Sequence, residues 1–205
     1  MIRHHPSDET LLACAAATLP EAHALVVAAH AALCPACART LRHAEAAGGA
    51  ILSDLPPTAL AADALERAFA HLDAPVAPAS WDRAPLPPTL AALATGRWRW
   101  TGPGIAMMSL LPRDASDTRL DLIRVAPGVA LLEHGHAGRE STCVLQGGFA
   151  DEDGEYHEGD FVAGGDGAHR PVALAGEPCI CLIATSGHLR PRGPLGWLVR
   201  PLLGM

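Results

Sequence analysis

The pattern of apolar and polar residues changes near residue 89, and this change divides the chain into two parts. Before residue 73, runs of helix-forming residues lie between residues that begin or break helices. From about residue 90, short alternating apolar runs lie between Gly, Pro and Asp turns, which is typical of an antiparallel β-sandwich or barrel. We therefore predict an α+β multidomain fold, with a small four-helix domain at residues 1–72 and a β-domain at residues 89–195.

A proline-rich segment separates the two predicted domains. Five prolines lie at positions 75, 78, 85, 87 and 88, and they predict an extended, semi-rigid linker over residues 73–88. Such a linker would let the two domains act semi-independently. Residues 196–205 are expected to form a C-terminal tail after the β-domain.

Each of the four predicted helices begins at a residue or motif that favours a helical first turn. The second helix should run to about His30, and the third to Gly48-Gly49 or a little beyond. In chain order, the four starting signals are Ser7, the capping box Thr18-Leu19-Pro20-Glu21, Cys34-Pro35 and Thr58.

The fourth predicted helix carries Leu65, Phe69 and Leu72 on one face. This apolar face has two interpretations, which the sequence leaves equally open. It packs on the other three helices, or it is a docking face for another protein. Four short helices make only a small core, so a bound metal would supply stability that the core lacks.

Composition and charge restrict the class of partner. The 205 residues have a formal net charge of -7 and contain 15 Arg, no Lys and 22 Asp and Glu. An acidic chain without a basic cluster argues against direct nucleic-acid binding, because phosphate contacts supply most of that affinity. We therefore expect a protein or small-molecule partner.

The sequence favours a cytoplasmic protein without membrane contact. Its N-terminal segment lacks the apolar run of a signal peptide, and no stretch reaches the roughly 18 apolar residues of a membrane span. The six cysteines are then expected to be reduced. Cys179 and Cys181 would share one face of a strand, as buried inert thiols or as a redox-active pair.

The segment His30-x-x-x-Cys34-x-x-Cys37 is the first candidate metal site. Residues at i, i+4 and i+7 of a near-helical segment converge on one point, and thiolate and imidazole ligands suit tetrahedral zinc. A closed structural site needs a fourth ligand, for which His4 and His5 are the nearest candidates.

A second candidate metal site lies within the β-domain. His134 and His136 would point to the same face of a strand, and the glycine-containing turn that follows can return Glu140 to the same point. His169 is the natural fourth ligand from a neighbouring strand. Three imidazoles and one carboxylate suit zinc, iron, manganese or nickel.

The spacing of this second site resembles the cupin family, which implies a jelly-roll-like sandwich. All positions of the first cupin motif are matched, by Gly128, His134, His136, Glu140 and Gly147. The second motif departs from the pattern: Gly159 opens it, but Gly165 replaces a proline, His169 comes one residue early and Val172 replaces an asparagine.

The two parts together resemble ChrR-type zinc-dependent cupin anti-sigma factors. The Arg3-His4-His5 start followed by His30, Cys34 and Cys37 matches the zinc-binding domain of that family, and this resemblance implies that His5 is the fourth ligand. It also implies a protein that inhibits an extracytoplasmic-function sigma factor through its helical domain. The cupin domain would respond to singlet oxygen or organic peroxide.

The alternative function is a cupin metalloenzyme, such as a dioxygenase, with a helical appendage. A site closed by four protein ligands leaves little room for catalysis, and the sequence shows no separate acid or base that must be catalytic. We therefore expect a regulator rather than an enzyme. A zinc-finger DNA-binding protein is excluded by the acidic charge and by the ligand spacing.

Overall fold

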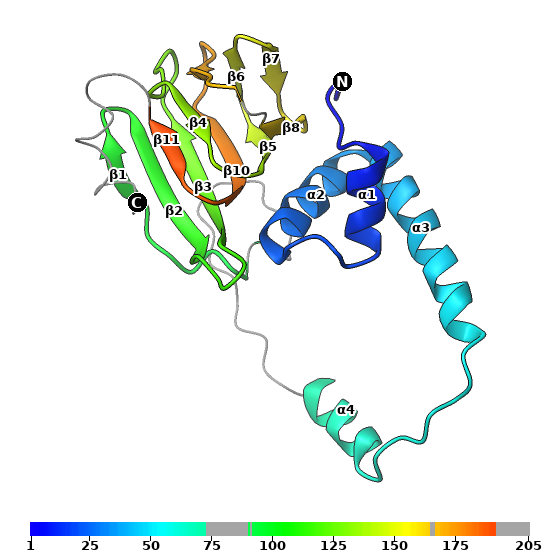
Figure 1. The fold of residues 1–205 in the computed structure, drawn as a ribbon. Helices are drawn as coiled ribbons and strands as arrows, with labels where there is room; N and C mark the ends of the chain where they lie inside the picture. The colour runs from blue at the N-terminus through cyan, green and yellow to red at the C-terminus, as the bar shows by residue number, and fades with distance from the viewer. Residues whose placement is uncertain (73–89, 91, 165–166, 192–205) are drawn as a thin grey trace.

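The computed structural model describes residues 1–72, 90, 92–164 and 167–191 (Figure 1). The predicted linker at 73–88, Gly165 and the predicted tail at 196–205 lie outside the described residues. The predicted α+β fold is confirmed, since four helices precede an antiparallel β-domain. The helices are α1 (Asp8–Ala15), α2 (Glu21–Leu33), α3 (Pro35–Ser53) and α4 (Ala64–Leu72).

Two of the four predicted helix starts are confirmed. The Ser7 hydroxyl accepts a hydrogen bond from the N–H of Thr10 at the start of α1, and Pro35 is the first residue of α3. Helix α2 begins within its predicted motif, at Glu21, but the capping box itself is wrong, because the Thr18 hydroxyl donates to the carbonyl of Ala13 at the end of α1. The Thr58 cap is also wrong, because α4 begins six residues later.

The β-domain is an antiparallel sandwich of one large and two small sheets. Its large sheet has the strand order β1-β2-β3-β10-β5-β8, and the small sheets are β7-β6-β9 and β11-β4. In chain order the strands are β1 (Arg99–Gly102), β2 (Ile105–Leu111), β3 (Thr118–Val125), β4 (His134–His136), β5 (Glu140–Gln146), β6 (Gly148–Asp151), β7 (Gly154–His157), β8 (Phe161–Gly164), β9 (Val172–Ala173), β10 (Cys179–Ser186) and β11 (Leu189–Pro191).

The large sheet is apolar on both faces, and each face belongs to a different core. Val144 and Cys181 are paired across β5 and β10, and they point into the sandwich interior toward Phe149 of β6. The alternate residues Cys143 and Leu182 point the other way. Successive strand residues face opposite sides, so a nearly continuous apolar run indicates that both faces of a strand are covered.

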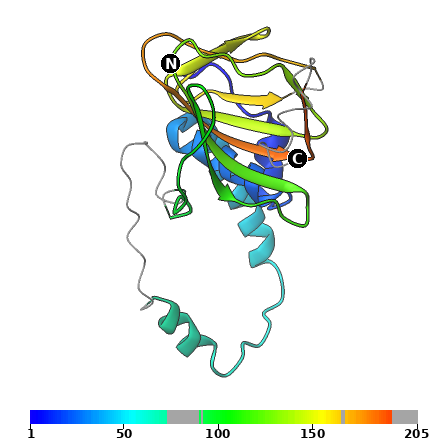
Figure 2. The same cartoon turned by 90° about the vertical axis from the view of Figure 1, so that its left-hand side faces the viewer.

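Helix α2 covers the outer face of the large sheet, as Figures 1 and 2 show. Val26 and Val27 of α2 are fully buried in the same hydrophobic cluster as Cys143 and Leu182. The helical unit α1–α3 and the β-domain therefore share one core, instead of being joined by a linker alone. The predicted domain boundaries remain a prediction.

Helix α4 lies apart from this shared core in both views (Figures 1 and 2). None of its residues is buried, and Leu65, Phe69 and Leu72 are 68%, 57% and 78% exposed. The structure therefore does not show the first interpretation of this apolar face, which was packing on the other three helices. Within the residues that the structure describes, no helix is long and apolar enough to cross a membrane.

Candidate metal centres

The N-terminal cluster consists of His5, His30, Cys34 and Cys37, whose ligand atoms all lie within 4.8 Å of one another. Cys34 both ends α2 and caps α3, so the chain turns at this residue and brings the last turn of one helix beside the first turn of the next. His5 Nδ1 lies 3.5 Å from each cysteine sulfur, and His30 Nε2 lies 3.3 Å from Cys37 Sγ.

The ring of His30 is held in one orientation by a carbonyl of the β-domain. Its Nδ1 donates a hydrogen bond to the Gly159 carbonyl at 2.7 Å, which leaves the Nε2 lone pair facing the cluster. Burial lowers the pKa of the His30 ring below its ordinary value, so the neutral, ligating form is favoured. A backbone partner of this kind is typical of histidines that bind metals.

The cysteines of the N-terminal cluster are buried and lie side by side. Burial, together with the neighbouring Cys34 thiol, raises the pKa of Cys37 to about 11. Two buried, adjacent thiols lose their protons only if a cation lies between them. Two thiolates together with two imidazoles are a ligand set that zinc accepts. The residues present therefore fit a tetrahedral zinc ion.

Of the two histidines proposed for the fourth position, the structure brings His5 into the cluster. The ring of His4 instead lies against Tyr156 of β7, with 4.7 Å between ring centroids. The carbonyl of His4 accepts a hydrogen bond from the N–H of Phe161 at 3.0 Å. The N-terminal segment thus runs along the edge of the β-domain, and this contact places the next residue, His5, over the cysteines.

The β-domain cluster consists of His134, His136, His169 and Glu140. The three imidazoles have ligand atoms within 4.8 Å of one another, and Glu140 Oε2 lies 3.2 Å from His136 Nε2. His169 pairs with His134 through an isolated antiparallel bridge, although it comes one residue early in the second motif. The structure therefore brings the three selected histidines together, and Glu140 joins them through its contact with His136.

Hydrogen bonds outside the β-domain cluster orient its members. His134 Nδ1 donates to the Leu132 carbonyl at 2.7 Å, and His169 Nδ1 lies 3.2 Å from Asp151 Oδ2. The Thr142 hydroxyl donates to Glu140 Oε1 at 3.3 Å. Both His134 and His169 thus use Nδ1 for contacts outside the cluster, and His169 Nε2 lies 3.2 Å from His136 Nε2 inside it. Such outer contacts are found around many metal-ligating histidines.

Burial shifts the protonation of the β-domain cluster toward neutral forms. It raises the pKa of Glu140 to about 7, and it lowers the pKa of His136 to about 4 with help from the neighbouring imidazoles. Neutral imidazoles and a carboxylate that ionises near neutral pH fit a divalent transition metal.

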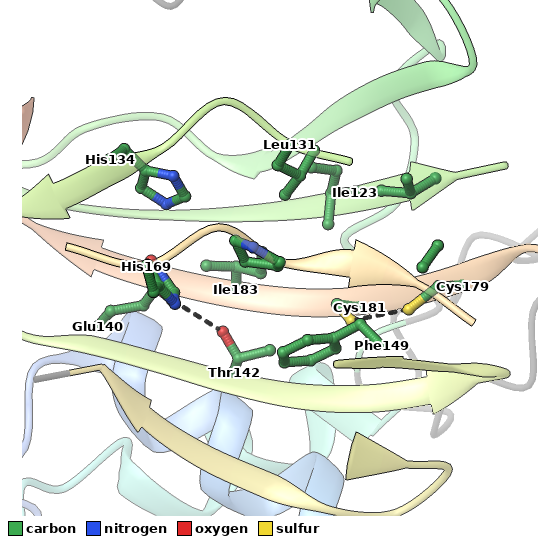
Figure 3. Close-up of a pocket in the computed structure, with 13 residues that line it drawn as sticks. Ile123, Leu131, His134, Glu140, Thr142, Phe149, His169, Cys179, Cys181 and Ile183 are labelled. Atoms are coloured by element: carbon green, nitrogen blue, oxygen red, sulfur yellow. Dashed lines mark hydrogen bonds between the residues drawn. The ribbon is translucent and has the colours of Figure 1, made fainter. Parts of the chain in front are cut away.

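A small apolar cavity extends from the β-domain cluster into the sandwich (Figure 3). Its volume is about 60 Å³. His134, His169 and Glu140 lie at one end, and Cys179 and Cys181 lie at the other with their sulfurs 3.5 Å apart. Both cysteines are buried free thiols on one face of β10, as their spacing predicted.

Two buried polar residues between the helices and the β-domain were not predicted from the sequence as functional. His23 is 1% exposed and contacts Ser141 and Ser186. Its position seven residues before His30, on the same face of α2, was an available signal. Asp160 is also 1% exposed and binds the N-terminal segment, which no local pattern indicates.

Comparison with known proteins agrees with this arrangement. Residues 88–189 match the family described as the ChrR Cupin-like domain. The anti-sigma-E factor ChrR of Cereibacter sphaeroides is 40% identical over 211 residues, which cover 98% of this chain and 97% of that protein. The crystal structure of Rhodobacter sphaeroides SigE in complex with the anti-sigma ChrR matches with a TM-score of 0.73 and 38% identity.

That structural match covers 91% of this chain and 100% of the other, so it includes the helices as well as the sandwich. The sequence similarity, too, extends over nearly the whole chain, at 98% coverage. On this similarity along nearly its whole length, the chain belongs to the ChrR family of anti-sigma factors.

Proposed function

We propose that this protein is a transcriptional regulator that binds an extracytoplasmic-function sigma factor, keeps it inactive, and releases it under singlet oxygen or organic peroxide stress. The observation that carries this proposal is the similarity to ChrR over 98% of the chain. A solved relative with a TM-score of 0.73 is a ChrR bound to a SigE. The net charge of -7 agrees with a protein partner rather than nucleic acid.

The N-terminal cluster would hold zinc as a structural ion. His5, His30, Cys34 and Cys37 fill the four positions of a tetrahedral site, so no position stays open for catalysis. The bound ion would join the N-terminal segment to the junction of α2 and α3. Loss of the ion should loosen the helical unit, because metal binding and folding are coupled in small domains.

The β-domain cluster would hold zinc or another divalent transition metal and act as the stress sensor. His134, His136, His169 and Glu140 come from three different segments of the sandwich. A metal among them would fix these segments to one another. The adjacent cavity ends at two thiols, which places oxidisable groups on the same interior surface.

The size of this cavity does not favour the alternative function, a cupin metalloenzyme. The volume of this cavity is about 60 Å³, whereas sites for small organic molecules usually measure about 300–1,000 Å³. A second cavity, between the helices and the β-domain, reaches about 320 Å³; Glu140 lines it, but the three imidazoles of the β-domain cluster do not. Because the cavity beside the imidazoles is small and the chain is similar to an anti-sigma factor, we propose a regulator without enzymatic activity. Because sigma factors act on RNA polymerase, we also propose that the protein works in the cytoplasm.

Co-expression with candidate sigma factors, followed by affinity purification and metal analysis, tests this function. The wild type should retain one sigma factor and carry about one zinc in the N-terminal cluster. Cys34→Ser should lose both, because the closed site loses a ligand. Cys14→Ser is the matched control, since Cys14 is a half-buried thiol outside the clusters. Failure of the wild type to retain any sigma factor would contradict the proposal.

A further inference from the structure

The loop between β7 and β8, residues 158–160, lies directly beside the N-terminal cluster. It belongs to the β-domain, yet its atoms contact the N-terminal segment and α2. Asp160 is a buried carboxylate that neither proposed metal site uses as a ligand. Its surroundings indicate a role in holding the ligands of the first site.

Asp160 accepts hydrogen bonds from both sides of the contact between the domains. Its Oδ1 accepts from the backbone N–H of Arg3 at 2.7 Å and of His4 at 3.1 Å, the two residues before the candidate ligand His5. Its Oδ2 accepts from the N–H of His157 at 2.9 Å. The carboxylate therefore ties the His5 segment to β7 without touching the cluster.

Gly159 contacts the same cluster from the other side. Its carbonyl accepts the hydrogen bond from His30 Nδ1 at 2.7 Å. Gly159 has a φ of 89°, and a Cβ atom there would lie 2.6 Å from the Ile2 side chain. Both the backbone conformation and the close approach of the N-terminal segment therefore require glycine at this position.

Strand β8 connects this loop to the β-domain cluster within four residues. At its first residue, the N–H of Phe161 donates to the His4 carbonyl. At its last residue, Gly164 pairs with Glu140, and a Cβ atom at Gly164 would lie 2.8 Å from the Glu140 Cβ. One short strand thus contacts both clusters.

We propose that the loop of residues 158–160 completes the N-terminal metal site from the β-domain, with Asp160 positioning His5 through the backbone and the Gly159 carbonyl orienting His30. Two of the four ligands then depend on the β-domain for their placement. This inference rests on the proposed zinc site. It adds that two residues of the β-domain, Gly159 and Asp160, hold the zinc ligands His30 and His5 in place.

The main test is the variant Asp160→Asn in the full-length chain. Asparagine has one acceptor oxygen and one NH₂ donor, so it cannot accept hydrogen bonds from both the N-terminal segment and His157. Loss of a residue that orients a metal ligand typically weakens metal affinity about 10- to 100-fold. We expect a loss in this range at the N-terminal cluster.

Cobalt(II) separates the two metal sites in the measurement. It accepts the same tetrahedral ligands as zinc. Of the two candidate clusters among the described residues, only the N-terminal one contains cysteine, so thiolate-to-cobalt absorption reports this cluster. Zinc affinity follows from displacement of that signal by zinc. Asp121→Asn is the matched control, because Asp121 is a buried aspartate, 4% exposed, located in β3 away from the cluster.

A second pair of variants tests the same contact from the N-terminal side. Arg3→Pro removes the backbone N–H that donates to Asp160 and leaves the β-domain unchanged, whereas Arg3→Ala keeps this N–H and changes only an exposed side chain. We expect weaker metal binding for Arg3→Pro than for Arg3→Ala. If Asp160→Asn does not fold, this pair of variants still tests whether the contact with Asp160 positions His5.

The outcomes distinguish this inference from the proposed zinc site. Absence of thiolate-to-cobalt absorption in the wild type would overturn the zinc site itself. Wild-type absorption with equal zinc affinities in Asp160→Asn and Asp121→Asn would overturn the positioning role alone, as would equal affinities in Arg3→Pro and Arg3→Ala. Weaker binding confined to Asp160→Asn and Arg3→Pro would support it.

Discussion

Among single residues, His23 has a direct consequence for the pH dependence of stability. Both of its ring nitrogens lie 2.9 Å from serine hydroxyls, Ser141 and Ser186, in the contact between α2 and the β-domain. Burial, and next the charge of Arg139, lowers the pKa of His23 to about 4. The folded protein therefore holds this ring in its neutral form, whereas an unfolded chain would protonate it near pH 6.5.

The sign of the effect follows from proton uptake. Between about pH 6.5 and pH 4 the unfolded state binds a proton at His23 that the folded state does not, so acidification favours unfolding. The contribution is complete above pH 6.5 and disappears as the pH falls toward 4. A shift of this size corresponds to about 3 kcal/mol, and we expect about 2 kcal/mol because solvent and ions screen part of it.

The variant His23→Gln isolates this contribution, because glutamine offers a donor and an acceptor but does not titrate. The free energy of unfolding should be measured by denaturant titration at several pH values from 7.5 to about 4.5. The wild type should lose about 2 kcal/mol more than the variant over this range. Parallel curves for the two proteins would show that His23 is not the group responsible.

Local spacing was sufficient to select the core of each cluster, because it determines which side chains share a helix or strand face. This applies to His30, Cys34 and Cys37 in the first cluster and to His134, His136 and Glu140 in the second. The distant member His5 was selected by the family resemblance, and His169 by its place in the second cupin motif.

Local spacing did not indicate Asp160 or the partners of His23, because these contacts join residues more than 100 positions apart, although the helical spacing of His23 and His30 pointed to a shared face. Spacing alone left both His4 and His5 open, and the family resemblance selected His5. The structure places His5 Nδ1 3.5 Å from both cysteine sulfurs, while His4 lies against Tyr156.

At the level of secondary structure, the exposed face of α4 is the feature that most needs an explanation. Leu65, Phe69 and Leu72 lie on one side of the helix and have no covering element among the described residues. Isolated helices of nine residues are marginal in water, so this helix gains stability when its apolar face is covered. We propose that the sigma factor covers this face.

The variant Phe69→Asp tests the proposed contact. Because Phe69 is 57% exposed, we expect the substitution to change the free energy of unfolding by less than about 0.5 kcal/mol. It should weaken sigma-factor binding at least tenfold, since it places a charge in an apolar contact. Glu66→Ala, also on α4, is the control and should bind like the wild type. Unchanged affinity in Phe69→Asp would exclude α4 as a docking element.

The number and type of elements could be predicted, but their mutual packing could not. Helical and strand signals gave four helices and an antiparallel sandwich, both confirmed. Two predicted caps failed: Thr18 bonds the preceding helix, although α2 still begins within its motif at Glu21, and Thr58 lies outside α4. Periodicity shows that a face of α2 is buried, but it does not show that the covering surface is the sheet.

For the molecule as a whole, the shared core means that the two proposed metal sites are connected through packed structure. Val26 and Val27 of α2 pack on the large sheet, and β8 contacts both clusters. A change at Glu140 therefore has a short structural route to the residues that hold His5 and His30. The proposed stress response does not require a signal to pass through the linker.

The double variant His134→Ala, Glu140→Ala tests whether the β-domain cluster is the sensor. It removes two candidate ligands and leaves the N-terminal cluster intact, so it should still bind the sigma factor and keep it silent. It should no longer release the sigma factor when cells are exposed to singlet oxygen. A signal shifts binding only if it changes the relative stability of the two states, by a few kcal/mol for nearly complete release.

The matched control for that variant is His157→Ala, which removes an exposed histidine of the same domain outside the cluster. This control should respond to singlet oxygen like the wild type. Sigma-dependent transcription is the measurement, and zinc content is determined in parallel to confirm that the N-terminal cluster stays loaded. If the double variant releases the sigma factor as the wild type does, the β-domain metal has no part in sensing. The thiols of Cys179 and Cys181, at the far end of the same cavity, would then be the next residues to replace.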